Sequence, residues 1–208
     1  DKRDLLGETA HHPRWALAWK FPAEEAVTVL MDVFWQTGRT GNVTPVSRVA
    51  PVVVSGVTVE NTTLHNKGEV ERLGIMIGDK VRVVRRGDVI PKITEVLGPA
   101  HDSDLIDRSH SDGTPFSESL PYRSEIPVPE RCPRCSTDLI IDGAFIRCTN
   151  IDCPSRLERG ILYWCRKLGM DGIGEKLAEQ LCSSGLVTSL GDLYRLENRE
   201  QELISLER

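Results

Sequence analysis

Four cysteines carry the clearest chemistry in this sequence. They fall within 22 residues at the spacing C-x2-C-x12-C-x4-C, and they are Cys132, Cys135, Cys148 and Cys153. Two close pairs joined by a short loop can bring four thiolates to one tetrahedral ion, and zinc accepts four sulfur ligands. Because protein would fill all four positions, that zinc would be structural. Two disulfides, four unrelated thiols and an iron site are the alternatives.

The residues between the two cysteine pairs predict the element that positions them. Leu139–Ile141 and Ala144–Ile146 are short apolar runs on either side of Asp142-Gly143. This pattern predicts a β-hairpin. The hairpin would return the second pair of cysteines to the first.

The remaining cysteines bear on the cellular compartment. Cys165 and Cys182 lie in helix-like sequence without a close partner. The sequence also shows no signal peptide and no apolar run long enough to span a bilayer. These features favour a reducing compartment. We therefore expect a cytoplasmic protein that does not contact a membrane.

Charge is distributed unevenly along the chain. The net charge is −5, which argues mildly against a nucleic-acid partner. Residues 66–92 and 131–167, however, each hold seven basic against four acidic residues. Local basic faces matter more for a polyanion than the total does. Ordinary solvated charge is the alternative.

Residues 27–105 read as alternating strands with one short helix. Val27, Val29, Met31, Val33 and Trp35 would share one face of the first strand. The expected elements are strands at 27–36, 43–50, 51–62, 80–86 and 89–97, and a helix at 66–73 capped by Asn66 and closed by Gly74. Three strands, a helix and two strands are the layout of an OB-fold barrel, which often binds nucleic acid. Another small barrel is the alternative.

The segments that flank this pattern differ from it. Near the start, Trp15, Leu17 and Trp19 alternate with alanines, as in a strand buried on both faces. Residues 106–130 are rich in Asp, Ser, Pro and Gly and predict a linker or loop. From residue 156 onward two apolar stripes predict helices, with Gly172-Ile173-Gly174 between them. This resembles a helix-hairpin-helix motif, although a plain helix turn would also fit.

The expected fold class is therefore multidomain, mainly β and then α. An OB-fold barrel at 27–105 would be followed by the linker at 106–130, a small four-cysteine zinc finger at 131–155 and a helix-hairpin-helix segment at 156–208.

Taken in order, the motifs resemble those of the bacterial NAD-dependent DNA ligases. Arg14–Ala23 (RWALAWKFPA) is similar to the last nucleotidyltransferase motif of that family. Gly38–Gly41 (GRTG), Thr63–Asn66 (TLHN) and Arg86–Pro91 (RGDVIP) resemble its OB-domain motifs. The four cysteines and the helix-hairpin-helix follow in the family's order. The resemblance makes residues 1–26 the end of an adenylation domain.

The resemblance implies a function. Such a ligase takes AMP from NAD onto a lysine, passes it to the 5′-phosphate of a nick and lets the 3′-hydroxyl displace it, in DNA replication and repair. The implied cofactors are structural Zn²⁺, with NAD and Mg²⁺ in the complete enzyme. The implied partners are nicked double-stranded DNA and an N-terminal adenylation lobe, and the protein would be a monomer. Lys20 would contact the AMP phosphate; a surface lysine that ends a strand is the alternative.

The resemblance also implies a DNA-binding surface. The residues expected there are Arg39, Thr40, Arg85, Arg86, Val89, Ile90, Gly172 and Gly174. Arginine can fork onto phosphate, and backbone N–H groups of a glycine hairpin can face it. Val89 and Ile90 would press into the minor groove or, alternatively, begin a strand as core residues. His65 is expected to be a hydrogen-bonded structural histidine.

One motif of the family is absent from these 208 residues. The nucleophilic lysine of such ligases lies in a Lys-x-Asp-Gly sequence, which does not occur here. We therefore expect an internal part of a ligase that has no catalytic nucleophile of its own and is inactive alone. A non-catalytic DNA-binding module and a zinc-bearing scaffold that binds protein are the alternative functions.

Overall fold

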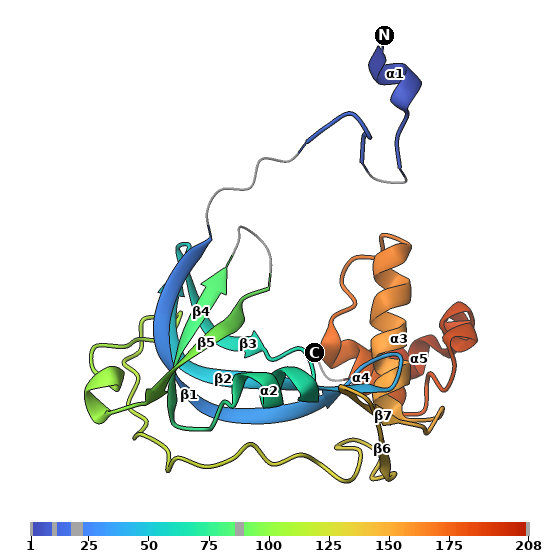
Figure 1. The fold of residues 1–208 in the computed structure, drawn as a ribbon. Helices are drawn as coiled ribbons and strands as arrows, with labels where there is room; N and C mark the ends of the chain where they lie inside the picture. Colours follow the sequence, from blue (N-terminus) through green and yellow to red (C-terminus); the bar gives the residue numbers. More distant parts are fainter. Residues whose placement is uncertain (1, 10–11, 18–22, 86–89, 207–208) are drawn as a thin grey trace.

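In a computed structural model of the chain, residues 2–9, 12–17, 23–85 and 90–206 are described (Figure 1). The β-strands are β1 (Glu24–Thr37), β2 (Asn42–Val54), β3 (Val57–Thr63), β4 (Asp79–Arg85), β5 (Lys92–Pro99), β6 (Leu139–Asp142) and β7 (Phe145–Cys148). The helices are α1 (Lys2–Leu6), α2 (Lys67–Leu73), α3 (Pro154–Lys167), α4 (Glu175–Ser183) and α5 (Glu200–Ile204), with 3₁₀ helices η1 (Asp102–Leu105) and η2 (Leu190–Arg199).

Strands β1–β5 pair in a closed cycle, which we call the ring. β1 pairs with β2 and β4, β2 with β3, and β4 with β5, all antiparallel. A parallel contact between Thr63 and Lys92 joins β3 to β5 and completes the cycle. Apolar side chains such as Leu30, Leu64 and Val81 fill its core. The predicted order of three strands, a helix and two strands is confirmed.

Strand β1 departs from simple alternation. Its first half pairs with β4 and its second half with β2, and a bulge lies between Leu30 and Asp32. Val29 and Met31 pack in one apolar cluster with Ala50, whereas Val33 packs with Leu30 in the ring core and Val27 is exposed. The prediction that these alternate residues share one face is therefore wrong. The bulge re-aims the side chains, because one extra residue shifts the alternation of the strand.

The predicted break between Ala50 and Pro51 is wrong. β2 continues to Val54 and shows a register irregularity between Arg48 and Val52. The turn lies instead at Ser55-Gly56, where φ is +52° and +70°. Two positive φ angles are what a tight two-residue hairpin turn requires. Pro51 therefore marks an irregularity within a strand.

Helix α2 follows its predicted caps. The Asn66 side chain accepts a hydrogen bond from the backbone N–H of Glu69 at 2.9 Å. Gly74 ends the helix in the left-handed conformation, at φ +58° and ψ +29°. An Asn N-cap and a Gly C-cap each satisfy backbone groups that a helix end leaves unpaired.

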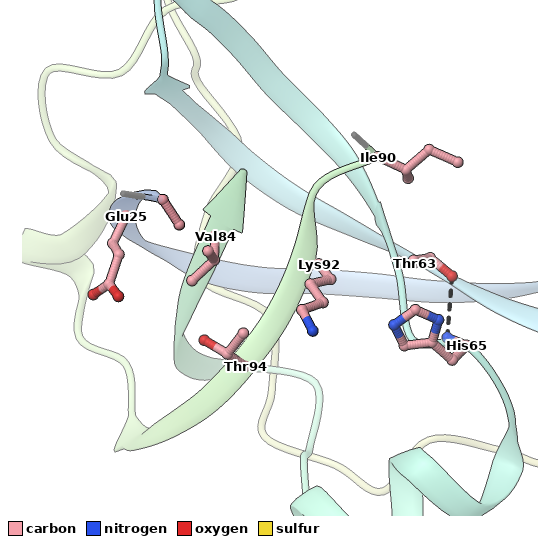
Figure 2. Close-up of a pocket in the computed structure, with 8 residues that line it drawn as sticks. Glu25, Thr63, His65, Val84, Ile90, Lys92 and Thr94 are labelled. Carbon is pink, nitrogen blue, oxygen red and sulfur yellow. Dashed lines mark hydrogen bonds between the residues drawn. The ribbon is translucent and has the colours of Figure 1, made fainter. Parts of the chain in front are cut away.

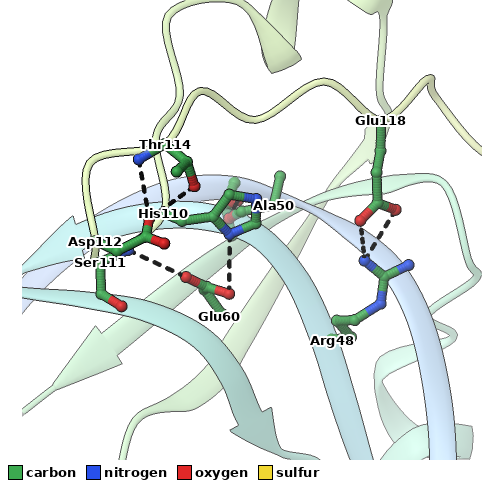
Figure 3. Close-up of polar contacts among 9 residues, drawn as sticks. Arg48, Ala50, Glu60, His110, Ser111, Asp112, Thr114 and Glu118 are labelled. Carbon is green, nitrogen blue, oxygen red and sulfur yellow. Dashed lines mark hydrogen bonds and ion pairs between the residues drawn. The ribbon is translucent and has the colours of Figure 1, made fainter.

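Residues 106–130, which we call the strap, lie along the ring. Phe116 and Leu120 pack against a second apolar cluster that includes Val29 and Met31. Figure 3 shows two polar contacts of the strap: Glu118 accepts from Arg48 at 2.7 Å, and His110 lies 3.2 Å from Glu60. The strap has no helix or strand of its own, yet its side chains hold it against β2 and β3.

The ion pair between Arg123 and Asp79 holds the strap at the first residue of β4. Arg123 Nε donates to Asp79 Oδ1 at 2.7 Å, and the Asp79 carboxylate is fully buried. We expect Arg123→Ala to lower the free energy of unfolding by about 2 kcal/mol, because a buried carboxylate loses its charged partner. Urea unfolding measures this.

A matched control is available in the strap's continuation. Arg131→Ala removes an ion pair with Asp138 in which both side chains are mostly exposed. It should change the stability by no more than about 0.5 kcal/mol. Equal effects of the two substitutions would contradict the importance assigned to the buried pair.

The segment before β1 differs from its prediction. Residues 12–17 form a turn and irregular backbone in place of a strand, and Leu17 is 98% exposed. A strand buried on both faces needs flanking strands, and among the described residues none lies beside this segment (Figure 1). Lys20 and Trp19 lie outside the described residues.

The helices after residue 153 form a separate apolar cluster. Ile161, Leu162 and Cys165 of α3 are buried against Ala178 and Leu181 of α4. The two apolar stripes that the sequence predicts are buried in this cluster, whereas Leu168, the C-cap of α3, is half exposed. Within the described part of the chain, none of the helices has the length and apolar composition needed to cross a membrane.

Candidate metal centre and nucleic-acid interface

The structure gathers the four predicted cysteines at one point. All four sulfurs lie within 4.8 Å of one another. Cys132 Sγ is 3.9 Å from Cys153 Sγ, and Cys135 Sγ is 3.5 Å from Cys148 Sγ. Zinc–sulfur bonds of about 2.3 Å in a tetrahedron place sulfurs about 3.8 Å apart, so the donor set fits zinc. Its ligands would be Cys132, Cys135, Cys148 and Cys153.

Local sequence explains how each sulfur is aimed. At the first pair, the Ser136 N–H donates to the Cys132 carbonyl at 2.9 Å, and Ser136 takes a φ of +57°. The predicted hairpin β6–β7 is confirmed and carries Cys148 at its end. Cys153 is the N-cap of α3, followed by a proline in the first turn. The fourth ligand therefore also starts the helical region.

The cysteine thiols differ in their pKa. Burial raises the pKa of Cys153 to about 12 and that of Cys148 to about 11, and the neighbouring Cys135 sulfur adds to both effects. Burial also raises the pKa of Cys135, but hydrogen bonds with the Thr137 hydroxyl and backbone N–H outweigh it and bring the pKa to about 6. Four thiolates at this spacing need a cation to neutralise them.

Residues 131–153, the cysteine module, are joined directly to the ring. Strand β7 extends the ring's sheet by pairing with the start of β2, Ile146 opposite Val43. The Gly68 N–H donates to the Ala144 carbonyl at 3.1 Å, which ties α2 to the β6–β7 turn. Figure 1 shows β6 and β7 between the ring and α3. The module therefore lies between two larger parts of the molecule.

The glycine-flanked turn between β1 and β2 reaches the helical region. Gly41 N–H donates to the Gly38 carbonyl at 2.9 Å, and Arg39 and Thr40 are exposed at the tip. The Arg39 guanidinium lies 4.2 Å from the ring centroid of Tyr163 in α3. Both line a cavity of about 490 Å³ that also includes Trp164. A predicted DNA contact is thus placed against an aromatic side chain.

One large cavity of the described residues lies where β3 meets β5. It has a volume of about 750 Å³ and is lined by Ala23, Glu25, Thr63, His65, Val84, Ile90, Lys92 and Thr94. Figure 2 shows the Lys92 and His65 side chains approaching the cavity from β5 and from the segment after β3. His65 has a φ of +59°, and its backbone N–H donates to Thr63 Oγ1 at 3.0 Å. His65 is exposed, and the expectation of a hydrogen-bonded structural histidine stays a prediction.

The remaining predicted DNA residues are dispersed. Arg85 and Ile90 line a neighbouring groove of about 480 Å³, and Ile90 is 71% exposed. Arg86 and Val89 lie outside the described residues. Gly172 and Gly174 are exposed between α3 and α4, and Gly174 is the N-cap of α4.

Ion pairs neutralise much of the predicted basic surface. In residues 66–92, the bases that have carboxylate partners include Lys67, Arg72, Lys80 and Arg82. In residues 131–167 they are Arg131, Arg134, Arg147 and Arg159. Lys92 has no carboxylate within ion-pair distance among the described residues. Its ammonium group is therefore available to an anionic ligand.

Some residues of these sites were missed from sequence. Tyr163 and Trp164 lie on the side of α3 away from its apolar stripe, where two adjacent aromatics were a signal that could have been used. Lys92 is one of seven bases in residues 66–92, and the sequence does not distinguish it from the others. Thr37, which contacts Cys132, gives no sequence signal, because the two residues are 95 positions apart.

Comparison with known proteins agrees with this arrangement. Residues 27–104 match the NAD-dependent DNA ligase OB-fold domain. A DNA ligase of Nautilia profundicola is 42% identical over 205 residues, which are 98% of this chain and 28% of the relative. DNA ligases of Nitrosococcus oceani and Myxococcus xanthus are 41% and 42% identical, each over 100% of this chain and 29% of the relative. The chain spans less than a third of these relatives, and it belongs to the family of bacterial NAD-dependent DNA ligases.

Proposed function

We propose that this chain forms the DNA-holding part of an enzyme that seals nicks in duplex DNA, in replication and repair. The observation that carries the proposal is the position of Lys92 and His65 in the cavity between β3 and β5, on a ligase OB-fold domain. Thr63 and Thr94 add hydroxyl donors to the same cavity. Phosphate oxygens accept hydrogen bonds from ammonium, imidazole N–H and hydroxyl groups, which position a protein on the DNA backbone.

We assign the parts of the chain as follows. The ring is an OB barrel closed by the contact between β3 and β5, residues 131–155 are a zinc finger, and residues 156–208 begin a helix-hairpin-helix domain. Residues 1–26 belong to an adenylation domain, in which Lys20 contacts the AMP phosphate.

The hairpin between α3 and α4 is a second DNA contact in this proposal. Ile173 packs against the helical core, while Gly172 and Gly174 on either side are exposed. Exposed glycines let phosphate approach the backbone closely, and the N–H groups in the first turn of a helix can donate to an anion. Such contacts carry no sequence information, which suits an enzyme that must act at any nick.

The chemistry would take place in the complete enzyme. There NAD would be the source of AMP, Mg²⁺ would assist phosphoryl transfer, and the DNA 5′-phosphate would be activated as an adenylate. This chain holds the duplex, contributes the Lys20 contact to the adenylation lobe, and acts as a monomer in the cytoplasm. Its zinc stabilises the fold and takes no part in the reaction.

Binding to nicked duplex DNA as a function of salt tests the DNA-holding role. Affinity should fall steeply as salt rises, since each neutralised phosphate releases counterions. Lys92→Ala should weaken binding and reduce the slope of log K against log salt by about 1. A flat salt dependence for the parent chain would contradict the proposal.

Lys80→Ala is the matched control for this measurement. It removes the same formal charge from the same domain, but Lys80 already pairs with Asp104 at 2.6 Å and lies outside the cavity. Its salt slope should equal that of the parent. Nick sealing by a longer ligase that contains this chain separates the enzyme from a non-catalytic DNA-binding module: the module would bind the nick without sealing it.

A further inference from the structure

The last residue of β1 touches the cysteine cluster. Thr37 belongs to the ring, is 4% exposed, and places its Oγ1 3.2 Å from Cys132 Sγ. Cys132 is itself buried and lies beside Cys153. A hydroxyl from one part of the molecule thus meets a sulfur from another, 95 residues away in sequence.

The state of the sulfur decides the direction of this hydrogen bond. A cysteine that binds a metal does so as a thiolate, which can only accept. The Thr37 hydroxyl must then donate to Cys132 Sγ, and a hydrogen bond to a charged acceptor is stronger than one between neutral groups. Because both residues are buried, water does not easily replace this donor.

We infer that Thr37 is a positioning residue for the metal centre, through which metal binding is coupled to the ring. Its hydroxyl orients the Cys132 thiolate and stabilises the charge that this ligand brings to the cluster. Partners of this kind in the shell around a metal typically alter its affinity by about 10–100-fold. The coupling works in both directions, so the bound metal also holds the end of β1 against the cysteine module.

Zinc affinity of the 208-residue chain tests this inference. We expect Thr37→Val to bind Zn²⁺ at least about 10-fold more weakly than the parent in competition with a chromophoric chelator. Thr37→Ser, which keeps the hydroxyl, should restore the parent affinity. With Co²⁺ as a spectroscopic probe, Thr37→Val should shift the thiolate-to-metal absorption band, and Thr37→Ser should not.

Thr28→Val is the matched control. Thr28 lies in the same strand, is fully buried, and donates to the Ala50 carbonyl at 2.5 Å, away from the cysteines. It should reduce stability without changing zinc affinity. If Thr37→Val does not fold, Thr37→Ala against Thr37→Ser gives the same comparison. The inference is overturned if the variants with and without the hydroxyl bind Zn²⁺ equally, if Thr28→Val loses as much affinity, or if the parent binds no Zn²⁺.

Discussion

Removing the metal with a chelator is expected to unfold residues 131–153 while the ring stays folded. The cysteine module has little core of its own: its buried cluster consists of Val43, Ile146 and three cysteines. A two-stranded hairpin such as β6–β7 is not stable by itself. Structural zinc contributes an apparent binding free energy of about 10–16 kcal/mol, which is lost with the ion.

The ring should survive because its core is independent of the metal. Twelve buried residues, from Leu30 to Ile126, fill it. Limited proteolysis with and without chelator measures the difference, and new cleavage should appear between residues 125 and 165 before any within β1–β5. Affinity for nicked duplex should fall at the same chelator concentration, since Cys153 is the N-cap of α3 and the helical region loses its fixed attachment.

Two cysteine variants sharpen this experiment. Without chelator, Cys135→Ser should show the cleavage pattern that the parent chain shows after chelation, because the substitution removes one of the four ligands. Cys182→Ser removes a partly buried thiol outside the cluster and should behave as the parent does. If chelation leaves both the cleavage pattern and DNA affinity unchanged, the metal does not fix the helical region to the rest of the molecule.

Features that depend on neighbours in sequence were predicted well. The cysteine spacing, the β6–β7 hairpin and the caps of α2 each need only a few adjacent residues. The order of the ring strands followed from alternation and from the glycines that separate them. In each case the physical cause, such as a cap or a turn, lies within the segment itself.

Features that depend on distant contacts were not predicted. Residues 106–130 have the composition of a free loop, yet Arg108 donates to the Val27 and Pro51 carbonyls and so lies along the ring. The contact of Arg39 with Tyr163 and that of Thr37 with Cys132 join parts of the chain that sequence patterns treat separately. The composition of a segment indicates which local structure it can form, but contacts between distant segments depend on the packing of the whole chain.

The close approach of Gly41 to the cysteine module makes this position unusually sensitive. Gly41 has a φ of +85°, and a Cβ placed there would lie 2.5 Å from the Cys148 carbonyl oxygen. The two backbones are also joined by a hydrogen bond from Cys148 N–H to the Gly41 carbonyl, at 2.8 Å. Because Cys148 is held by the cluster, the obstructing carbonyl cannot move away without displacing a sulfur.

Gly41→Ala is therefore expected to lower the free energy of unfolding by about 3 kcal/mol, from backbone strain together with the clash. Gly56→Ala isolates the strain: Gly56 follows the other end of β2, has a φ of +70°, and a Cβ added there would meet no atom within 4 Å. We expect Gly56→Ala to lower the free energy of unfolding by about 1 kcal/mol. Urea unfolding at saturating Zn²⁺ measures both, and Zn²⁺ affinity should fall for Gly41→Ala alone. Equal losses of stability for the two variants would mean that the Cys148 carbonyl moves away from the added Cβ at little cost. The sheet and the metal centre would then be less tightly joined than their contacts indicate.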